Sequence, residues 1–240
     1  MSKCIIIPAF NEYENINLLL SEIYKTDLKD LIIIIIDDSD QSFEKKIKIK
    51  KDRLIYLSRG KKLGRGSAVL HGIKHAFNTF DDIDLFIEMD ADMSHDPKEL
   101  KKNVSLFYEK KLDLLISSRY REKSEIINWP LKRKILSFLS NKLSKFILNV
   151  PITDYTNGYR IYSNHAAKFV VHNCGKIGDG YIVLSEILIQ LYYNQYKVDE
   201  TDTVFVNRVR GTSNVTFSEI LFSLIGLYKI WKEKKRIIGN

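Results

Sequence analysis

Short apolar runs, rich in β-branched residues, recur along the first half of the chain. They occupy 3–7, 31–36, 53–59, 84–90 and 112–120. Runs of this length and composition predict buried strands. Because stretches with helical spacing lie between them, the pattern predicts βαβ units and therefore an α/β fold with a mostly parallel sheet.

The stretches between these runs differ in how strongly they predict helices. After Asn11, apolar residues recur at helical spacing as far as Ile23, and 67–79 and 98–110 also favour helices. Residues 41–52 are polar with sparse isoleucines, and we expect a short helix there.

Amphipathic helices dominate the second half of the pattern. A helix over 131–148 places six apolar residues on one face: Leu131, Ile135, Phe138, Leu139, Leu143 and Phe146. We further expect a helix at 179–194 and a strand at 203–209. The last segment, 216–240, predicts an apolar helical stripe followed by a basic tail, so we divide the chain at 215.

Charge adds a preference for anionic partners. The 240 residues carry 38 basic and 30 acidic side chains, and 126–153 holds five basic residues and no acidic one. A lysine-rich proteome explains such a balance without function, whereas basic patches also suit phosphates, anionic lipid or nucleic acid. The N-terminus does not resemble a signal peptide, and no apolar stretch is long enough to predict a transmembrane helix. We expect a cytoplasmic protein, with peripheral contact to a membrane as an extension.

The stretch "LFIEMDADMSHDP" (85–97) carries the strongest chemical signal. Asp90 and Asp92 follow a buried strand two positions apart, and such carboxylates face one side of an extended chain. A solvated acidic turn is one interpretation. The end of a buried strand in a parallel sheet is where ligands bind, and hard oxygen donors suit Mg²⁺ or Mn²⁺, so we favour a metal site.

Other strand ends carry charged residues as well. Asp37 and Asp38 end the second strand, where they suit a helix cap, a tight turn, an acidic pocket like that of response regulators, or a contact to a base or ribose. Arg119 and Arg208 lie near later strand ends, where an arginine is either a surface charge or a partner for a metal-bound diphosphate.

A glycine loop, "GKKLGRG" (60–66), precedes the helix expected at 67–79. It matches neither the Walker A pattern nor the dinucleotide fingerprint. Its backbone N–H groups and its basic residues, Lys61, Lys62 and Arg65, suit the approach of a diphosphate.

Taken together, these stretches resemble glycosyltransferase family 2, and within it the polyprenol (dolichol) phosphate mannose synthases that lack a transmembrane anchor. The resemblance rests on seven stretches in the family's order: "IIIPAFNEYENI", "IIDDSDQS", "GKKLGRGSAVLHGIKHA", "EMDADMSHDP", "SSRY", "DYTNGYRIY" and "FVNRVRGTSN". It implies a GT-A-like, Rossmann-type fold with amphipathic helices on the acceptor side. It also implies a catalytic domain over 1–215 and a segment at 216–240 suited to a membrane interface.

The resemblance assigns roles to particular positions. The residues implied to hold the nucleoside are Pro8, Phe10, Glu12, Ile36 and Asp38. Asp90, Ala91 and Asp92 are implied to hold the diphosphate and the metal. Arg119 and Arg208 are implied to contact phosphates, and they complete the catalytic set with Asp90 and Asp92.

Three positions depart from the family pattern, and two more match it on the acceptor side. Phe10 replaces a usual tyrosine, Ser94 stands where some members place a glutamine metal ligand, and Asn214 replaces a common lysine. Lys132 and Arg133 match basic residues on the acceptor side.

The implied reaction moves mannose from GDP-mannose to a polyprenyl (dolichyl) monophosphate with inversion. An acceptor phosphate is already ionised near neutral pH, so no strong general base is required. Two alternatives stay open: a lipid-phosphate glucosyltransferase or polysaccharide-building transferase with another nucleotide sugar, and a non-catalytic binding module. Nucleic acid is a poor partner, because the clustered acids repel phosphate and no nucleic-acid-binding motif stands out.

Overall fold

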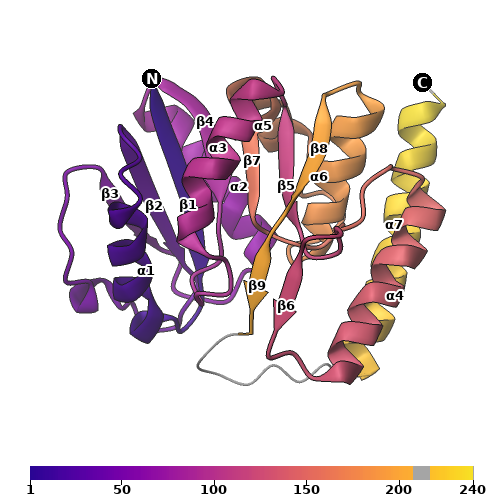
Figure 1. Cartoon of the computed structure of the whole chain (residues 1–240), viewed down its shortest axis with the longest axis horizontal. Helices are drawn as coiled ribbons and strands as arrows, with labels where there is room; N and C mark the ends of the chain where they lie inside the picture. Colours follow the sequence, from indigo (N-terminus) through magenta and orange to yellow (C-terminus); the bar gives the residue numbers. More distant parts are fainter. Residues whose placement is uncertain (208–216, 240) are drawn as a thin grey trace.

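A seven-stranded sheet forms the centre of the molecule (Figure 1). The computed structural model describes residues 1–207 and 217–239, with side chains in the last helix from Ile225 onward. The strand order is β3-β2-β1-β4-β7-β5-β8. In chain order, the strands are β1 (Ser2–Ala9), β2 (Leu31–Asp37), β3 (Leu54–Ser58), β4 (Ile83–Glu88), β5 (Leu114–Ser118), β7 (Arg160–Ser163) and β8 (Val198–Asp202).

The sheet is mostly parallel, which confirms the fold class predicted from the sequence. β7 alone among these strands is antiparallel, to β4 on one side and β5 on the other. β1 pairs in parallel with both β2 and β4. The strand order therefore reverses at β1. An open α/β sheet binds its ligands beyond the carboxyl ends of its parallel strands, at such a reversal.

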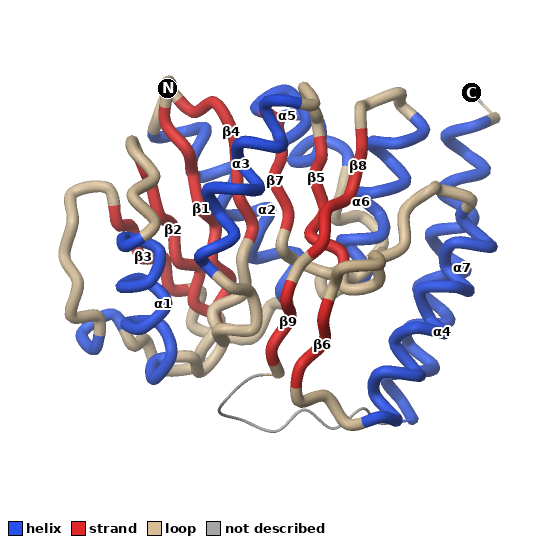
Figure 2. Tube along the Cα trace, in the orientation of Figure 1, coloured by secondary structure: helices blue, strands red, loops and turns tan. Residues whose placement is uncertain are grey.

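Helices cover both faces of the sheet (Figure 2). The helices are α1 (Tyr13–Lys25), α2 (Arg65–Thr79), α3 (Leu100–Glu109), α4 (Leu131–Leu148), α5 (Asn164–Asn173), α6 (Ile182–Tyr193) and α7 (Phe217–Ile238). In β2 the isoleucines alternate: Ile34 belongs to the core cluster that includes residues of α2, α5 and α6, whereas Ile35 belongs to the cluster that includes residues of α1 and α3. Both faces of the strand are buried, which explains its continuous apolar sequence.

The helix expected over 41–52 is wrong. Only a single 3₁₀ turn, η1 (Glu44–Lys46), forms there. The apolar residues Phe43, Ile47 and Ile49 pack against the core side that holds α1. Ile47 and Ile49 are two positions apart, so an extended chain can turn both inward whereas a helix cannot.

A two-stranded sheet extends from the large one near the carboxyl ends of the parallel strands (Figure 1). It pairs β6 (Glu125–Ile127) with β9 (Val204–Val206). The strand expected over 203–209 is thus present as β9 within the described residues. The sequence pattern missed β8 and α5.

The pair α4 and α7 closes one side of the molecule, where the two helices lie side by side (Figure 1). Leu227 and Ile230 of α7 belong to the core on the α6 side. Within the described residues, no helix combines the length and apolarity needed to cross a membrane. The division of the chain at 215 stays a prediction.

A substitution at Gly72 tests how closely α2 packs on the sheet. A Cβ at Gly72 would lie 2.7 Å from Ile6 Cγ2 and 3.2 Å from Ile36 Cγ1, and both isoleucines are fully buried. Gly72→Ala should therefore lower the free energy of unfolding by about 1–3 kcal/mol through overpacking. Urea denaturation measures this. Gly180→Ala is the control, because nothing lies within 4 Å of its Cβ; an equal loss there would contradict close packing as the cause.

Candidate active site

The loops that follow β1, β2 and β3 are tied together at the carboxyl edge of the sheet. The Asp38 N–H donates to the Ala9 carbonyl, and the Arg59 N–H donates to the Asp37 carbonyl. The Asn11 N–H donates to Ser39 Oγ at 2.8 Å. The strand ends therefore form one continuous rim.

Asp38 lies in this rim as the centre of a buried ion pair. Arg59 binds both of its carboxylate oxygens, and Leu63 and Gly64 each donate a backbone N–H to Asp38 Oδ2 at 3.0 Å. Asp38 thus anchors the glycine loop to the end of β2. Its implied contact with a nucleoside stays a prediction.

Asp37 has a different set of partners. Its Oδ1 accepts from Ser39, and its Oδ2 accepts from the Tyr56 hydroxyl. Burial, together with the hydrogen bond to Asp37, raises the pKa of Tyr56 to about 12. Tyr56 therefore remains a neutral donor, and Asp37 is a structural residue of the rim.

The other residues implied to hold the nucleoside gather near Asp38. Pro8 and Ile36 are buried and face each other in the β1–β2 register. The Phe10 ring is 38% exposed, with Lys62 Nζ 4.8 Å from its centroid. Glu12 accepts a hydrogen bond from Asn15 at 2.7 Å. An exposed aromatic ring beside a lysine is suited to stack on a base and attract its phosphates.

An arginine side chain from α2 lies among the carboxylates at the end of β4. Arg65, the first residue of α2, donates to Glu88 and, through Nε, to Asp90 Oδ1 at 2.7 Å. Tyr162 donates to the second oxygen of Glu88 at 2.6 Å. The placement of Glu88 in the strand, as the sequence predicted, is confirmed.

The loop after Asp90 is held in one conformation by His95. The Asp90 N–H donates to His95 Nδ1 at 3.1 Å, so Nε2 carries the proton and donates to Asn157 Oδ1 at 3.0 Å. The His95 ring stacks on Tyr159 and meets the edge of Phe205. This histidine therefore positions the loop between β4 and the segment before β7.

The residues expected at a metal fit a hard divalent cation. Asp90 and Asp92 supply carboxylate oxygens, and Ser94 Oγ is buried without a hydrogen-bond partner in the described part of the molecule. Asp92 Oδ1 accepts from the Ser94 N–H at 3.1 Å, which holds Asp92 within the same turn. Since no group of three His, Cys, Asp or Glu side chains with metal-site geometry occurs among the described residues, water and substrate phosphates would complete the shell.

Arg119 lies at the end of β5 in a buried ion pair with Asp154. Nε and Nη2 bind the two carboxylate oxygens at 2.7 and 2.8 Å, and Nη2 also donates to Thr156 Oγ1. Burial alone would raise the pKa of Asp154, but Arg119 and the backbone donors outweigh it and hold that pKa below its usual value. The implied phosphate contact of Arg119 stays a prediction, and any such contact must share the guanidinium with Asp154.

A second arginine lies beside Arg119 across an indole ring. Arg133, on the first turn of α4, has its guanidinium 4.0 Å from the Trp129 ring, and Arg119 lies 5.4 Å from the same ring. Trp129 Nε1 is buried and has no hydrogen-bond partner in the described part of the chain. Two guanidinium groups that pack on one indole ring form a cationic environment that favours an anion.

Two of the predicted residues cannot be placed. Arg208 and Asn214 lie outside the described residues, as does the start of the 216–240 segment. β9 does reach the acidic loop, because the Val206 N–H donates to the Ser94 carbonyl at 3.1 Å. Lys132 is exposed at the start of α4.

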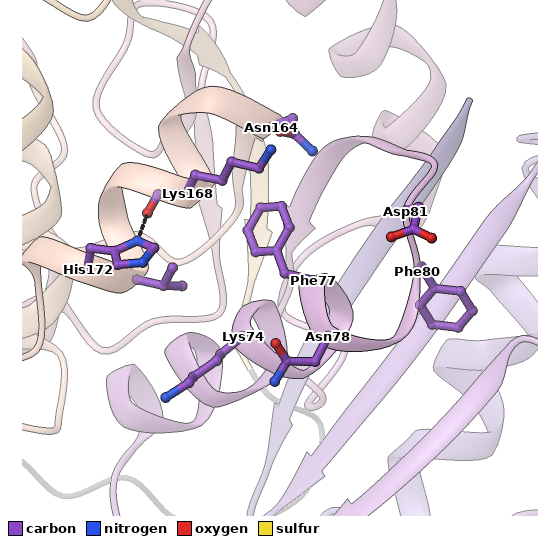
Figure 3. Close-up of a pocket in the computed structure, with 9 residues that line it drawn as sticks. Lys74, Phe77, Asn78, Phe80, Asp81, Asn164, Lys168 and His172 are labelled. Carbon is purple, nitrogen blue, oxygen red and sulfur yellow. Dashed lines mark hydrogen bonds between the residues drawn. The ribbon is translucent and has the colours of Figure 1, made fainter.

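A pocket of about 420 Å³ lies away from this rim, between α2 and α5 (Figure 3). Its lining includes Lys74, Phe77, Lys168 and His172. Asn164, also in the lining, donates to the carbonyl of Ile83, the first residue of β4. The pocket is therefore at the amino end of β4, opposite the acidic cluster.

Comparison with known proteins identifies the family. The profile described as "Glycosyl transferase family 2" matches residues 4–170. The chain belongs to glycosyltransferase family 2. This transferase is 30% identical over 220 residues to the polyprenol monophosphomannose synthase of Mycolicibacterium smegmatis, covering 90% of this chain and 82% of that one. It is 31% identical over 226 residues to an uncharacterized protein of Methanocaldococcus jannaschii, covering 92% and 90%.

Solved structures confirm the GT-A-like fold of the transferase. The glucosyl-3-phosphoglycerate synthase of Mycobacterium tuberculosis, in complex with Mn²⁺, UDP-glucose and phosphoglyceric acid, aligns with a TM-score of 0.68. The alignment covers 97% of this chain and 79% of that one at 16% identity. At this identity, the likeness establishes the fold alone.

Sequence reasoning missed several residues that organise the site of the transferase. Arg59 lay inside an expected strand run, and Asp154 and His95 had no assigned role. Their partners are 21, 35 and 62 residues away in sequence, so local pattern held no signal for the pairing. The available signal was the charged residue at the end of the run 53–59, which pointed to Arg59; His95 and Asp154 had no such signal.

Asp154→Ala should destabilise the transferase by about 3–5 kcal/mol, because it leaves Arg119 buried without its counter-ion. Chemical denaturation at pH 7 measures this loss. The depressed pKa of Asp154 means that its contribution is present above the unfolded pKa of about 3.9 and is lost as pH falls through the folded value. The variant should therefore lose less stability than wild type on acidification below about pH 4.

The control is Glu22→Ala, which removes an exposed i,i+3 pair with Lys25 and should leave the unfolding midpoint nearly unchanged. Equal effects of the two substitutions would contradict a special role for the buried pair.

Proposed function

We propose that the transferase moves mannose, with inversion, from GDP-mannose to a polyprenyl (dolichyl) monophosphate at the cytoplasmic face of a membrane. The observation that carries the proposal is the 30% identity to a polyprenol monophosphomannose synthase along 90% of the chain. The edge of the sheet supports it, because Arg65 binds Asp90 there and Arg119 directly follows β5.

The donor side of the proposal uses the rim between β1 and β4. Pro8, Phe10, Ile36 and Asp38 form the edge suited to a nucleoside, and Asp90 and Asp92 would hold Mg²⁺ or Mn²⁺ with the diphosphate. The bound cation would supply Lewis-acid stabilisation of the leaving nucleoside diphosphate. The solved relative with Mn²⁺ and UDP-glucose supports a divalent cation in this fold.

The acceptor side uses Arg133, Trp129 and Arg119. A lipid monophosphate needs cations and N–H donors, and this group offers two guanidinium ions that pack on one indole ring. The acceptor phosphate is mostly ionised at neutral pH, since its second pKa is about 6. A general base is therefore unnecessary, which agrees with His95 having both ring nitrogens engaged in structural hydrogen bonds.

The outer face of α4 supports a membrane-bound acceptor. Its side chains expose an apolar stripe that includes Leu131 at 72%, Leu139 at 54% and Phe146 at 85%. Lysines flank the stripe, and Tyr228 of the neighbouring α7 is 54% exposed. Exposed apolar residues flanked by lysines are typical of a helix that lies in a lipid interface.

A transfer assay tests the reaction. With labelled GDP-mannose and polyprenyl phosphate, wild type should convert the label into a chloroform-extractable product. Asp92→Asn should lower this turnover at least ~100-fold and weaken Mn²⁺-dependent nucleotide binding, because it removes a carboxylate that would hold the cation that stabilises the leaving diphosphate. Asp96→Asn is the matched control; Asp96 caps η2 (Pro97–Glu99) by accepting from the Lys98 N–H.

Each other outcome of the assay identifies an alternative. Extractable label from UDP-glucose alone would assign a lipid-phosphate glucosyltransferase, and label found only in water-soluble glycan would assign polysaccharide synthesis. Wild type that transfers label from no donor, together with ligand binding that is unchanged in Asp92→Asn, would indicate a non-catalytic binding module.

Vesicle binding tests the membrane face. Leu139→Ser combined with Phe146→Ser should weaken partition into anionic vesicles at least ~tenfold, since each buried apolar side chain contributes about 1.5–3 kcal/mol. Sedimentation with vesicles measures this. Leu18→Ser on α1, at a site 53% exposed, is the control. Unchanged partition of the double variant would contradict the assignment of α4 to the interface.

A further inference from the structure

Arg65 is a cation built into the acidic end of β4. Its side chain is 10% exposed, against 1% for Glu88 and 18% for Asp90. Its Nη1 donates to Glu88, while Nε and Nη2 lie 2.7 and 2.6 Å from Asp90 Oδ1. The guanidinium thus occupies the space between the two carboxylates, which would otherwise repel each other.

The glycine loop and the segment before β7 deliver this guanidinium to one place. Gly64, at φ +102°, precedes α2, and a Cβ on it would lie 2.6 Å from the Asp179 carbonyl oxygen. A Cβ on Gly158 would lie 1.8 Å from Arg65 Nη2, which instead donates to the Gly158 carbonyl at 3.3 Å. Both glycines leave room that the arginine and its loop require.

The two carboxylates are held differently. Glu88 has one oxygen on Arg65 and the other on Tyr162, so both of its oxygens are engaged within the core. Asp90 meets Arg65 through Oδ1, and its backbone N–H is fixed by His95. Arg65 therefore sets the rotation of the Asp90 carboxylate, while Glu88 holds Arg65.

Charge balance gives Arg65 a second effect. Glu88, Asp90 and Asp92 carry three negative charges, and Arg65 leaves the cluster at about −2. A divalent cation near a guanidinium is repelled, and this repulsion is strong where water is excluded. The diphosphate of a nucleotide sugar would add negative charge that offsets this repulsion.

We propose that Arg65 is a positioning residue for the donor site: it orients Asp90 and weakens metal binding to the empty site, so that the divalent cation and the nucleotide diphosphate bind together. This inference rests on the proposed metal-dependent transfer. In this proposal, Arg65 is the cation at the acidic stretch before the donor binds, and the divalent ion arrives together with the donor.

Mn²⁺ binding measured by electron paramagnetic resonance, with and without GDP, tests the proposal. Arg65→Leu should bind Mn²⁺ about tenfold more tightly than wild type without GDP, because a repelling charge is removed. Its kcat should fall, with a smaller change in the donor KM, because Asp90 loses its orientation. Arg65→Lys keeps the positive charge but loses the planar guanidinium with its fixed set of donors. Its Mn²⁺ affinity should therefore stay near wild type while kcat falls.

Two further variants keep the test decisive. Arg65→Leu alone leaves Glu88 buried without a cation, so Arg65→Leu/Glu88→Gln supplies a neutral partner for Tyr162. It keeps the net charge of the cluster at about −2 but releases Asp90 Oδ1 from Arg65, so it should also bind Mn²⁺ more tightly than wild type. Arg53→Leu, at the exposed pair with Asp82, is the matched control and should change neither Mn²⁺ binding nor kcat.

The outcomes separate this inference from the proposed function. Unchanged Mn²⁺ affinity in both Arg65→Leu and Arg65→Leu/Glu88→Gln, with active wild type, would overturn only the role of Arg65. A raised donor KM with unchanged kcat would make Arg65 a direct substrate contact and would also overturn it. Wild type that binds no Mn²⁺ even with GDP would overturn the metal-dependent function together with this inference.

Discussion

Acidic side chains buried at one edge of the sheet need cations, and the molecule meets this need with three arginines. Arg59 binds Asp38, Arg65 binds Glu88 and Asp90, and Arg119 binds Asp154. A buried carboxylate without a partner costs several kcal/mol, so each pair constrains the loop that carries it. Arg59 and Arg119 directly follow the strands β3 and β5, and Arg65 begins α2. The strand ends of the Rossmann-type sheet are therefore joined by charge as well as by backbone hydrogen bonds.

This arrangement connects the loops of the site to one another before any ligand binds. The glycine loop is tied to Asp38 through the Leu63 and Gly64 N–H groups, and the acidic loop is tied to the β7 side through His95 and Asn157. Charged donors and acceptors in a partly dry rim interact more strongly than they would in water. Groups fixed in advance need little reorganisation when charge develops on a leaving diphosphate.

The sequence predicted the fold well because a strand buried on both faces needs a continuous run of apolar residues. "LIIIII" is apolar throughout because α-helices cover both faces of β2. Residues 41–52 were predicted wrongly because the inward-facing Ile47 and Ile49 follow an extended spacing that too few residues reveal. The positions of Asp38, Asp90 and Asp92 at strand ends were predictable from the apolar runs before them. Their arginine partners were not, because ion pairs between residues 21 to 35 positions apart depend on tertiary structure.

The acceptor side depends on the same physical argument at the protein surface. Arg133 lies in the first turn of α4 and Trp129 lies just before it, so the proposed anion-binding group adjoins the exposed apolar stripe of that helix. A lipid phosphate has the same division between a charged head and an apolar chain. Its head would meet the arginines while its chain follows the face of α4.

The central claim is that Asp90 and Asp92 receive a donor diphosphate together with a divalent cation, beside an arginine already in place. A crystal soaked with Mn²⁺ and GDP tests this most directly through anomalous scattering. The account predicts one manganese peak bridging the diphosphate and the carboxylates of Asp90 and Asp92, with Arg65 still on Asp90 Oδ1. A GDP molecule bound elsewhere, or bound at this edge with no manganese at the acids, would contradict it.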